Sequence, residues 1–312
     1  MRVQNLTANA TNIYDVTPSS IVFTISKDGG FNFEKIEERS KGAKRAKEKK
    51  KKFLNFSFAS RRDVIMKPGK GQELGTEDPR IVYIARSKTY LMFYTSVTKG
   101  VVHSDLGPVR AMLSLATNDK DPSEYEEWKL QGYLFPSLNW SKSGALLVRE
   151  ESPSYLFWGD SSICIATTEN FVNYTDTGSC LLSPRDEMFD SELVESGPEP
   201  LPLSDGNLLF LYNSARATNI TNPKPGWNLQ YNLGYAVLSG KDPTQVLYRS
   251  ALPLLSPLLP WETCDGTDPL GLTPNVVFVE GWRPIPGERN RFFVWYQGCD
   301  SRIGVAEISV DI

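Results

Sequence analysis

The chain has 312 residues, a net charge of −3 and a pI near 5.5. This balance gives no electrostatic basis for binding nucleic acid. Its 21 Pro, 23 Gly and 11% aromatic residues are typical of a turn-rich β protein. No apolar run is long enough to cross a bilayer, so the sequence predicts no membrane span in this chain.

Five similar units follow one another along the chain. The first is a strand at residues 21–25 that runs into the turn signal Asp28-Gly29-Gly30. In each of the others, a strand rich in aromatic residues precedes a strand rich in Ala, Gly and Val: 90–94 with 111–116, 155–158 with 163–166, 208–212 with 233–237, and 292–296 with 303–306. Units at this interval predict an all-β fold, a five-bladed β-propeller of four-stranded antiparallel blades. Residues 1–312 then form a single domain.

A basic segment interrupts this pattern after the first unit. Residues 41–52 have the sequence KGAKRAKEKKKK, with no apolar partners. Such a run is typical of a solvated segment, and we expect a mobile insertion at about residues 38–53. The alternative is a tether to a polyanion or a membrane surface.

An acidic motif at residues 75–80, GTEDPR, comes directly before a β-type run at residues 81–84. Proline disfavours helical backbone in the residue before it, so we expect Asp78 to be extended, with a fixed carboxylate direction. Arg80 then projects to the same side and orients that carboxylate or binds a sugar hydroxyl. The alternative is a surface ion cluster, which contributes little.

Carboxylates are the only abundant groups for acid–base chemistry in this chain. The single histidine, His103, excludes a multi-histidine metal site, and we expect it in a loop between two strands. There is no glycine-rich phosphate loop, so the sequence predicts neither a nucleotide site nor a cofactor. Paired carboxylates point first to glycoside hydrolysis. Candidates besides Asp78 are Asp160, Glu192, Glu195, Glu199 and Asp300.

Several motifs, in their order and spacing, resemble glycoside hydrolase family 130. They are residues 75–80, 142–146, 197–200, 233–236 with 242–243, 274–278 with Gly281, and 296–300 with 303–306. That family consists of five-bladed propellers that act on β-mannosides as phosphorylases or hydrolases. The resemblance implies that Asp78 is the general acid of an inverting reaction and that Asp300 binds sugar hydroxyls. We assign Glu77, Arg80 and Lys142 to substrate binding on the same basis.

The departures from the family pattern bear on the reaction type. Phosphorylases of this family look as though they clamp phosphate with basic residues, and this chain has Asp160, Leu193 and Asn213 at those positions. A carboxylate there would repel phosphate, which favours an inverting β-mannosidase that hydrolyses β-linked manno-oligosaccharides. The candidates for the base that activates water are Glu195, Glu199 and Asp160, in that order. Glu199 and Ser143 stand where the family has Pro and Asp, which changes the expected sugar contacts.

Two other functions remain open. One is a β-mannoside phosphorylase, with inorganic phosphate as co-substrate and a clamp built from residues such as Arg149, Arg185 or Arg216. The other is a non-catalytic propeller that binds carbohydrate. An oligosaccharide or glycan is the expected partner in all cases, and the sequence leaves the oligomeric state open.

Acceptor motifs for N-glycosylation and four cysteines predict a secreted protein or one in the lumen of the secretory pathway. The acceptors are Asn5, Asn9, Asn55, Asn139, Asn173 and Asn219. We expect the signal or anchor segment to lie outside this chain. Sequence proximity favours the pairs Cys164–Cys180 and Cys264–Cys299 among three connectivities. The alternative is four free thiols in a cytosolic protein.

Overall fold

Antiparallel strands make up almost all the regular structure of the described residues. The computed structural model describes residues 2–3, 20–22, 64–103, 107–151, 153–218, 228–264 and 273–310. Its helical segments are α1 (Pro260–Thr263) and a 3-10 turn at Tyr125–Glu127. No helix in these ranges is long and apolar enough to span a membrane.

Four sheets have the size of propeller blades. The first consists of β4 (Gly75–Ile84), β5 (Thr89–His103), β6 (Gly107–Asn118) and β7 (Lys129–Tyr133). The second consists of β8 (Gly144–Leu147), β9 (Ser154–Trp158), β10 (Ile163–Thr168) and β11 (Thr175–Leu182). The third consists of β12 (Leu193–Ser196), β13 (Leu201–Pro202), β14 (Leu208–Ala217), β15 (Leu229–Leu238) and β16 (Val246–Arg249). The fourth consists of β17 (Val277–Pro284), β18 (Arg291–Gly298) and β19 (Arg302–Ser309).

The predicted number of blades is wrong for the described part of the chain, which contains four blades rather than five. The remaining strands, β1 (Arg2–Val3), β2 (Ser20–Val22) and β3 (Val64–Met66), form a small sheet of two- and three-residue strands. The strand expected at residues 21–25 is described only as far as Val22. The basic insertion predicted at about residues 38–53 lies outside the described residues.

The four predicted pairs of strands are all confirmed as neighbours in the sheets. Each pair joins two consecutive strands of one blade: β5 with β6, β9 with β10, β14 with β15, and β18 with β19. Their aromatic and β-branched residues suit a pleated surface that is buried on both faces between neighbouring blades. Local hydrophobic pattern was therefore sufficient to locate the centre of every blade.

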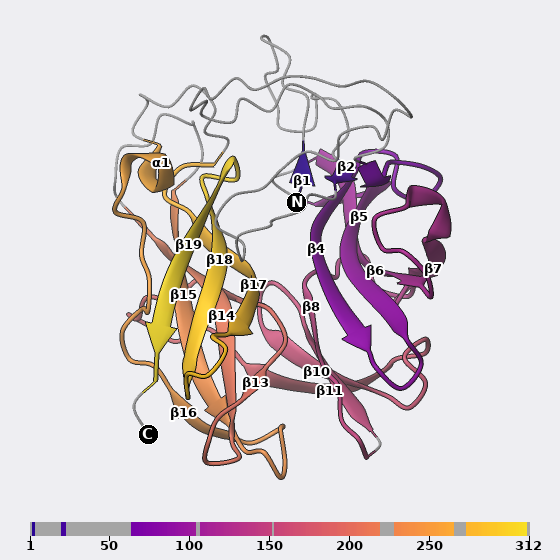
Figure 1. Cartoon of the computed structure of the whole chain (residues 1–312). Coiled ribbons are helices and arrows are strands. Elements are labelled where there is room, and N and C mark those ends of the chain that lie inside the picture. The colour runs from indigo at the N-terminus through magenta and orange to yellow at the C-terminus, as the bar shows by residue number, and fades with distance from the viewer. Residues whose placement is uncertain are drawn as a thin grey trace, which may run out of the picture.

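Apolar side chains pack between successive blades and fix their arrangement around the middle of the molecule. Figure 1 shows β4, β8 and β17 nearest the middle, with β7 and β19 farther out. Phe157 and Phe210 are completely buried, and their ring centroids lie 5.3 Å apart between the second and third blades. Phe135 and Trp158 join the first blade to the second at 4.3 Å. The first strand of each blade is thereby held facing the centre.

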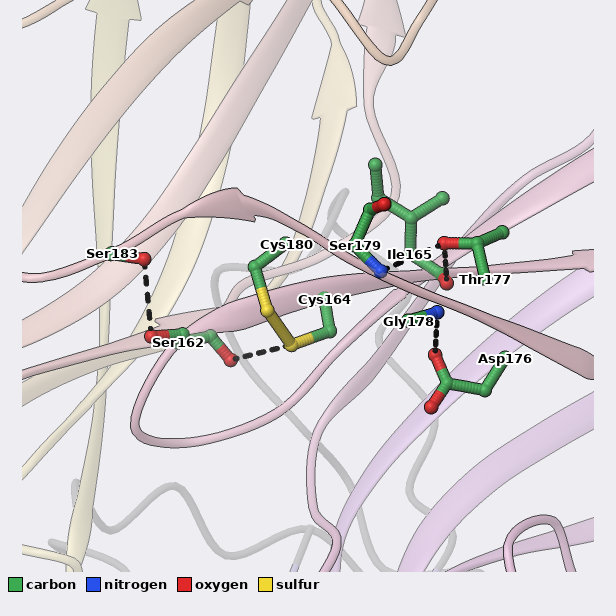
Figure 2. The surroundings of a disulfide bond; sticks show 9 residues. All are labelled: Ser162, Cys164, Ile165, Asp176, Thr177, Gly178, Ser179, Cys180 and Ser183. Atoms are coloured by element: carbon green, nitrogen blue, oxygen red, sulfur yellow. Dashed lines mark hydrogen bonds between the residues drawn. A yellow bond between two sulfur atoms is a disulfide. The ribbon is translucent and has the colours of Figure 1, made fainter.

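Both predicted disulfide pairings are confirmed. Cys164 on β10 lies opposite Cys180 on β11, and Figure 2 shows the bridge between these two strands. The second bridge joins Cys264, at the end of α1, to Cys299, which follows β18. Cys299 directly precedes Asp300, so this bridge anchors the backbone that carries one of the predicted substrate-binding residues.

The expectation of a loop around His103 is wrong. β5 continues through His103, which pairs with Gly107 of β6 across a register shift. Val101 and Val102 are β-branched, and they extend the strand beyond the polar residues that suggested a loop.

Candidate active site

Charged side chains on, or just before, the first strand of each blade converge at one place. Asp78 lies on β4, Lys142 lies two residues before β8, Glu195 lies on β12 and Glu280 lies on β17. Lys142 forms ion pairs with Asp78 and Glu195, and the charges of Asp78 and Glu195 both act on Glu280. A propeller brings these residues together because its first strands face a common centre.

Asp78 does not have the extended backbone that its proline predicted. Its φ is 51°, in the left-handed region, and the pairing of β4 with β5 shifts register between Glu77 and Arg80. Asp78 therefore sits in a β-bulge, where Pro79 needs no ladder hydrogen bond. A non-glycine residue in this conformation is strained, and such strain is concentrated at functional sites. Ser143 and Asp300 have similar φ angles of 51° and 53°.

Arg80 holds the backbone of the bulge in place. Its Nη1 donates to the carbonyl oxygen of Asp78 at 3.1 Å, its Nη2 to that of Ser196 at 2.9 Å, and its Nε to that of Gly197 at 3.1 Å. The side chain is 4% exposed. Arg80 was predicted to orient the Asp78 carboxylate or bind sugar, and these bonds show that it fixes β4 against β12.

Lys142 lies between the two carboxylates that chemistry of this kind requires. Its Nζ is 3.8 Å from Oδ2 of Asp78 and 3.9 Å from Oε1 of Glu195. Burial lowers the pKa of Lys142, but Glu195, Asp78 and Asp160 outweigh burial and raise it well above the ordinary value. The side chain is therefore a permanent cation that links the predicted acid to the first-ranked predicted base.

Glu195 is a buried carboxylate with a defined hydrogen bond. Its Oε1 accepts from the hydroxyl of Ser143, and the residue is 2% exposed. Burial raises the pKa of Glu195 and Asp160 adds to the increase, while Lys142, Arg80 and the Ser143 bond oppose it. A carboxylate with a raised pKa is a better proton acceptor than an exposed glutamate.

Asp160 lies at the same site, where Trp140 holds it. The indole Nε1 of Trp140 donates to Oδ2 of Asp160 at 2.6 Å. The charge of Asp160 acts on Lys142, Glu195 and Tyr231. Tyr231, on β15, was not predicted. Burial raises its pKa far above the ordinary value, so the phenol remains neutral.

Glu199 occupies a less central position than Asp78, Glu195 and Asp160. Burial raises the pKa of Glu199 to about 7, and a hydrogen bond to its own backbone partly offsets this effect. The charged groups around Lys142 do not contribute to the shift. The carbonyl of Glu199 accepts from the indole of Trp282 at 2.8 Å. Glu77 is buried on β4 beside Asp78. The structure thus brings Asp78, Glu195 and Asp160 together and sets Glu199 apart from them.

Asp300 lies at the edge of the same site. Its Oδ2 accepts from the hydroxyl of Thr273 at 2.7 Å, and its charge acts on Tyr231. The remaining acceptor capacity of the carboxylate is suited to sugar hydroxyls. Its role in binding substrate stays a prediction.

Glu280, like Tyr231, belongs to this site and was not predicted from the sequence. It interrupts the hydrophobic run at residues 276–279 and precedes Gly281, at the register shift between Val279 and Gly281. A single acid at the end of a buried strand, beside a glycine, was the available signal. Burial, followed by the charge of Asp78, raises its pKa to about 8.

The positions where a phosphate clamp was sought carry little free positive charge. Asn213 donates to the carbonyl of Val279 at 3.0 Å and accepts from its N–H at 2.8 Å, so both ends of its amide brace β14 against β17. Arg185 forms a two-pronged ion pair with Asp190.

The other two arginines considered for a clamp differ in their surroundings. Arg149 lies over the ring of Tyr155, 5.6 Å from its centroid. Arg216 is exposed at the end of β14 and donates to Gln230 at 3.1 Å. Within the ranges that the structure describes, no group of three or more His, Cys, Asp or Glu side chains is arranged to hold a metal ion.

Comparison with known proteins gives one family and several named relatives. A family model described as beta-1,4-mannooligosaccharide phosphorylase, the model of glycoside hydrolase family 130, matches residues 48–312. A 1,2-beta-oligomannan phosphorylase of Thermoanaerobacter sp. (strain X514) is 30% identical over 238 residues, which is 75% of this chain and 69% of that protein. A beta-1,2-mannobiose phosphorylase of the same organism is 29% identical over 236 residues, or 75% of this chain and 67% of that protein.

A solved structure of a glycosyl hydrolase from Bacteroides ovatus is similar in fold, with a TM-score of 0.71. The match covers 99% of this chain and 79% of that chain at 22% identity, and it bears on the fold alone. The matched family is the one that the sequence motifs resemble. Between the two reaction types, the named relatives favour phosphorolysis over the predicted hydrolysis.

Proposed function

The chain belongs to glycoside hydrolase family 130, an enzyme family that acts on mannosides, and we propose that it cleaves β-linked manno-oligosaccharides by transferring the mannosyl group to water with inversion. Family members named as phosphorylases use inorganic phosphate as co-substrate, and the family needs no cofactor. The proposal therefore concerns the nucleophile, and the choice is between water and phosphate.

The observation that carries the proposal is the sign of the charge around Lys142. Among the described residues, its ammonium faces Asp78, Glu195 and Asp160, and Glu280 adds a further carboxyl group. The guanidinium of Arg80 is bound to three backbone carbonyls. A phosphate dianion would meet an excess of carboxylates, whereas a neutral water molecule finds hydrogen-bond acceptors.

The geometry accommodates an inverting displacement. Asp78 protonates the glycosidic oxygen, directly or through a sugar hydroxyl, while the bond between that oxygen and the anomeric carbon breaks. Glu195 removes a proton from the water whose oxygen bonds to the anomeric carbon. The Lys142 distances to the two carboxylates limit their separation from above, and this limit allows the lower part of the range of roughly 6.5–9.5 Å found in inverting enzymes as well as the shorter spacing of retaining ones.

Phosphorolysis is the second candidate, and the relatives favour it. Both Thermoanaerobacter proteins are named phosphorylases, and their names specify β-1,2-linked mannosides. The arginine to consider is Arg216, which is exposed at the end of β14, the strand whose neighbour β15 carries Tyr231 of the site. An arginine here could contribute to a phosphate clamp.

One assay separates the two reactions. The protein is incubated with β-1,2- and β-1,4-linked manno-oligosaccharides, with and without inorganic phosphate, and free mannose and mannose 1-phosphate are measured. We expect free mannose with the α-anomer formed first, at a rate independent of phosphate. Mannose 1-phosphate formed only in the presence of phosphate would establish phosphorolysis instead. Sugar binding without turnover on either linkage would support a non-catalytic propeller.

We further propose that the protein resides in the secretory pathway or outside the cell. Two disulfides support this, because such bonds are rare in reducing compartments. Asn139 and Asn173, two of the predicted acceptors, are exposed and accessible to glycosylation. An increase in mobility after treatment of the native protein with an N-glycosidase would support this location, and glycan-free protein from its native source would count against it.

A further inference from the structure

Glu280 has a local structure that aims its side chain at the site. Val279 pairs with Tyr296 and Gly281 pairs with Trp295, so Glu280 is the extra residue of a bulge in β17. Both backbone groups of Val279 are held by the amide of Asn213. A bulge beside a site commonly redirects a side chain, and here the Asn213 bonds fix the residue before it.

One oxygen of the Glu280 carboxyl group is buried without a hydrogen bond. Its Oε1 is inaccessible to solvent and has no hydrogen-bond partner among the described residues. A buried, ionised carboxylate in that condition is costly, so the protonated form is favoured. Unsatisfied buried groups are uncommon in native proteins, and each one calls for a reason.

The charged groups that face Glu280 come from two neighbouring strands. In the described part of the chain they are Asp78 and Arg80 from β4 and Glu195 from β12. The Arg80 guanidinium lies over the ring of Phe278, 5.8 Å from its centroid, which places β4 directly beside β17. After burial, the charge of Asp78 has the largest effect on Glu280, so the two carboxyl groups titrate as a coupled pair.

We propose that Glu280 is a positioning residue for the general acid, and that it shares one proton with Asp78 at neutral pH. This inference rests on the proposed function, in which Asp78 donates to the leaving oxygen. Lys142, 3.8 Å from Oδ2 of Asp78, favours the ionised form of Asp78, which by itself would be a poor acid at pH 7. Glu280 opposes the effect of Lys142 on the ionisation of Asp78, so the pair keeps one proton.

The proton balance closes without any further reactant. The pair gives one proton to the glycosidic oxygen as its bond to the anomeric carbon breaks, and Glu195 receives one proton from the attacking water. After product release, solvent returns a proton to the pair and removes one from Glu195. The pair must hold its proton before each turnover, so the alkaline limb of the pH profile reports the titration of Asp78 and Glu280 together.

The test is the pH dependence of kcat/KM for Glu280→Gln, which keeps the shape of the side chain and removes its titration. We expect the alkaline limb, near pH 8 in the unmodified protein, to move down by at least one unit, with roughly a tenfold loss of rate per unit above the new limb. A dinitrophenyl β-mannoside needs little protonation to leave, so its cleavage should change far less.

Glu262→Gln is the matched control. Glu262 is also a buried glutamate, 2% exposed, and its Oε1 accepts from the hydroxyl of Tyr296 at 2.8 Å. This variant should lower the melting temperature and leave the alkaline limb unmoved. An alkaline limb in Glu280→Gln at the same pH as in the unmodified protein would overturn the inference.

A second readout separates this inference from the proposed function. Infrared difference spectroscopy of the protein, titrated from pH 6 to pH 10, detects the C=O stretch of a protonated carboxyl whether or not any mannoside is cleaved. We expect a band that disappears with a midpoint near pH 8 and is absent in Glu280→Gln. The same band in Glu280→Gln would refute the shared proton. If the band is present in the unmodified protein and absent in the variant, but the unmodified protein cleaves no mannoside, only the proposed function is in error.

Discussion

Replacing Lys142 with Met tests whether this ammonium sets the proton affinities of the acid and the base. The substitution retains an unbranched chain of similar length and removes the charge that lies 3.8 Å from Asp78 and 3.9 Å from Glu195. The ammonium favours the ionised form of each carboxylate, so its removal raises both pKa values. The acidic limb, set by Glu195, and the alkaline limb, set by Asp78, should therefore both move to higher pH.

The distances give the size of the shift. Unit charges about 4 Å apart interact by about 4 kcal/mol at an effective dielectric constant near 20, which corresponds to about three pH units. The Lys142 side chain is 22% exposed, and solvent screening reduces this value. We expect shifts of one to three units, measured as kcat/KM against pH on a manno-oligosaccharide.

Lys129→Met is the matched control, because Lys129 pairs with Asp119 at 3.1 Å on the exposed surface. It should move neither limb. An unchanged acidic limb in a folded, active Lys142→Met variant would refute Glu195 as the base that Lys142 controls. Loss of turnover at every pH, with the fold retained, would instead give Lys142 the substrate-binding role that the sequence predicted.

Three further predictions follow from the same contacts. Asp78→Asn should lower kcat on manno-oligosaccharides by roughly 10²–10⁴-fold, with a melting temperature close to that of the unmodified protein, and full activity would exclude Asp78 as the acid. Asp190→Asn should lower the free energy of unfolding by about 3–5 kcal/mol, measured by urea titration, because Asp190 is fully buried and pairs with Arg185 at 2.8 Å and Arg249 at 2.6 Å. A change below about 1 kcal/mol would contradict this role. The raised pKa of Glu280 means that, between about pH 4.5 and about pH 8, the folded state keeps a proton that the unfolded state releases. The free energy of unfolding should therefore fall as pH rises through this range, by up to about 1.4 kcal/mol per pH unit from Glu280. Glu280→Gln should remove that slope.

The sequence predicted the parts of the fold that depend on local pattern. Strands with aromatic and β-branched residues were located in every blade, because their burial leaves a hydrophobic signal in the residues themselves. The disulfides followed from proximity along the chain, and Cys164 and Cys180 lie on adjacent strands. The number of blades was not predictable in this way, because a short apolar run at residues 21–25 does not reveal whether it completes a full sheet.

The candidate site was predictable only where a motif carried it. Asp78 and Glu195 were identified, yet the backbone of Asp78 was not, because the bulge and the Arg80 bonds to three carbonyls override the local preference of a residue before proline. Tyr231 and Glu280 belong to no acidic motif. Their proximity to Asp78 and Glu195 arises from the packing of blades whose residues are far apart in sequence.

Asn213 stands where phosphorylases of the family look as though they have a basic residue. This difference links the missing phosphate clamp to the presence of Glu280. A basic residue at this position would carry charge toward the site, but a positively charged side chain has only donors and could not also accept from the N–H of Val279 as the asparagine amide does. Those two bonds fix β17 immediately before Glu280. The substitution that removes a positive charge at position 213 therefore also helps to hold a carboxyl group beside Asp78, and the lost charge makes the site less favourable for phosphate. This difference in charge is the basis on which we propose water, rather than phosphate, as the nucleophile.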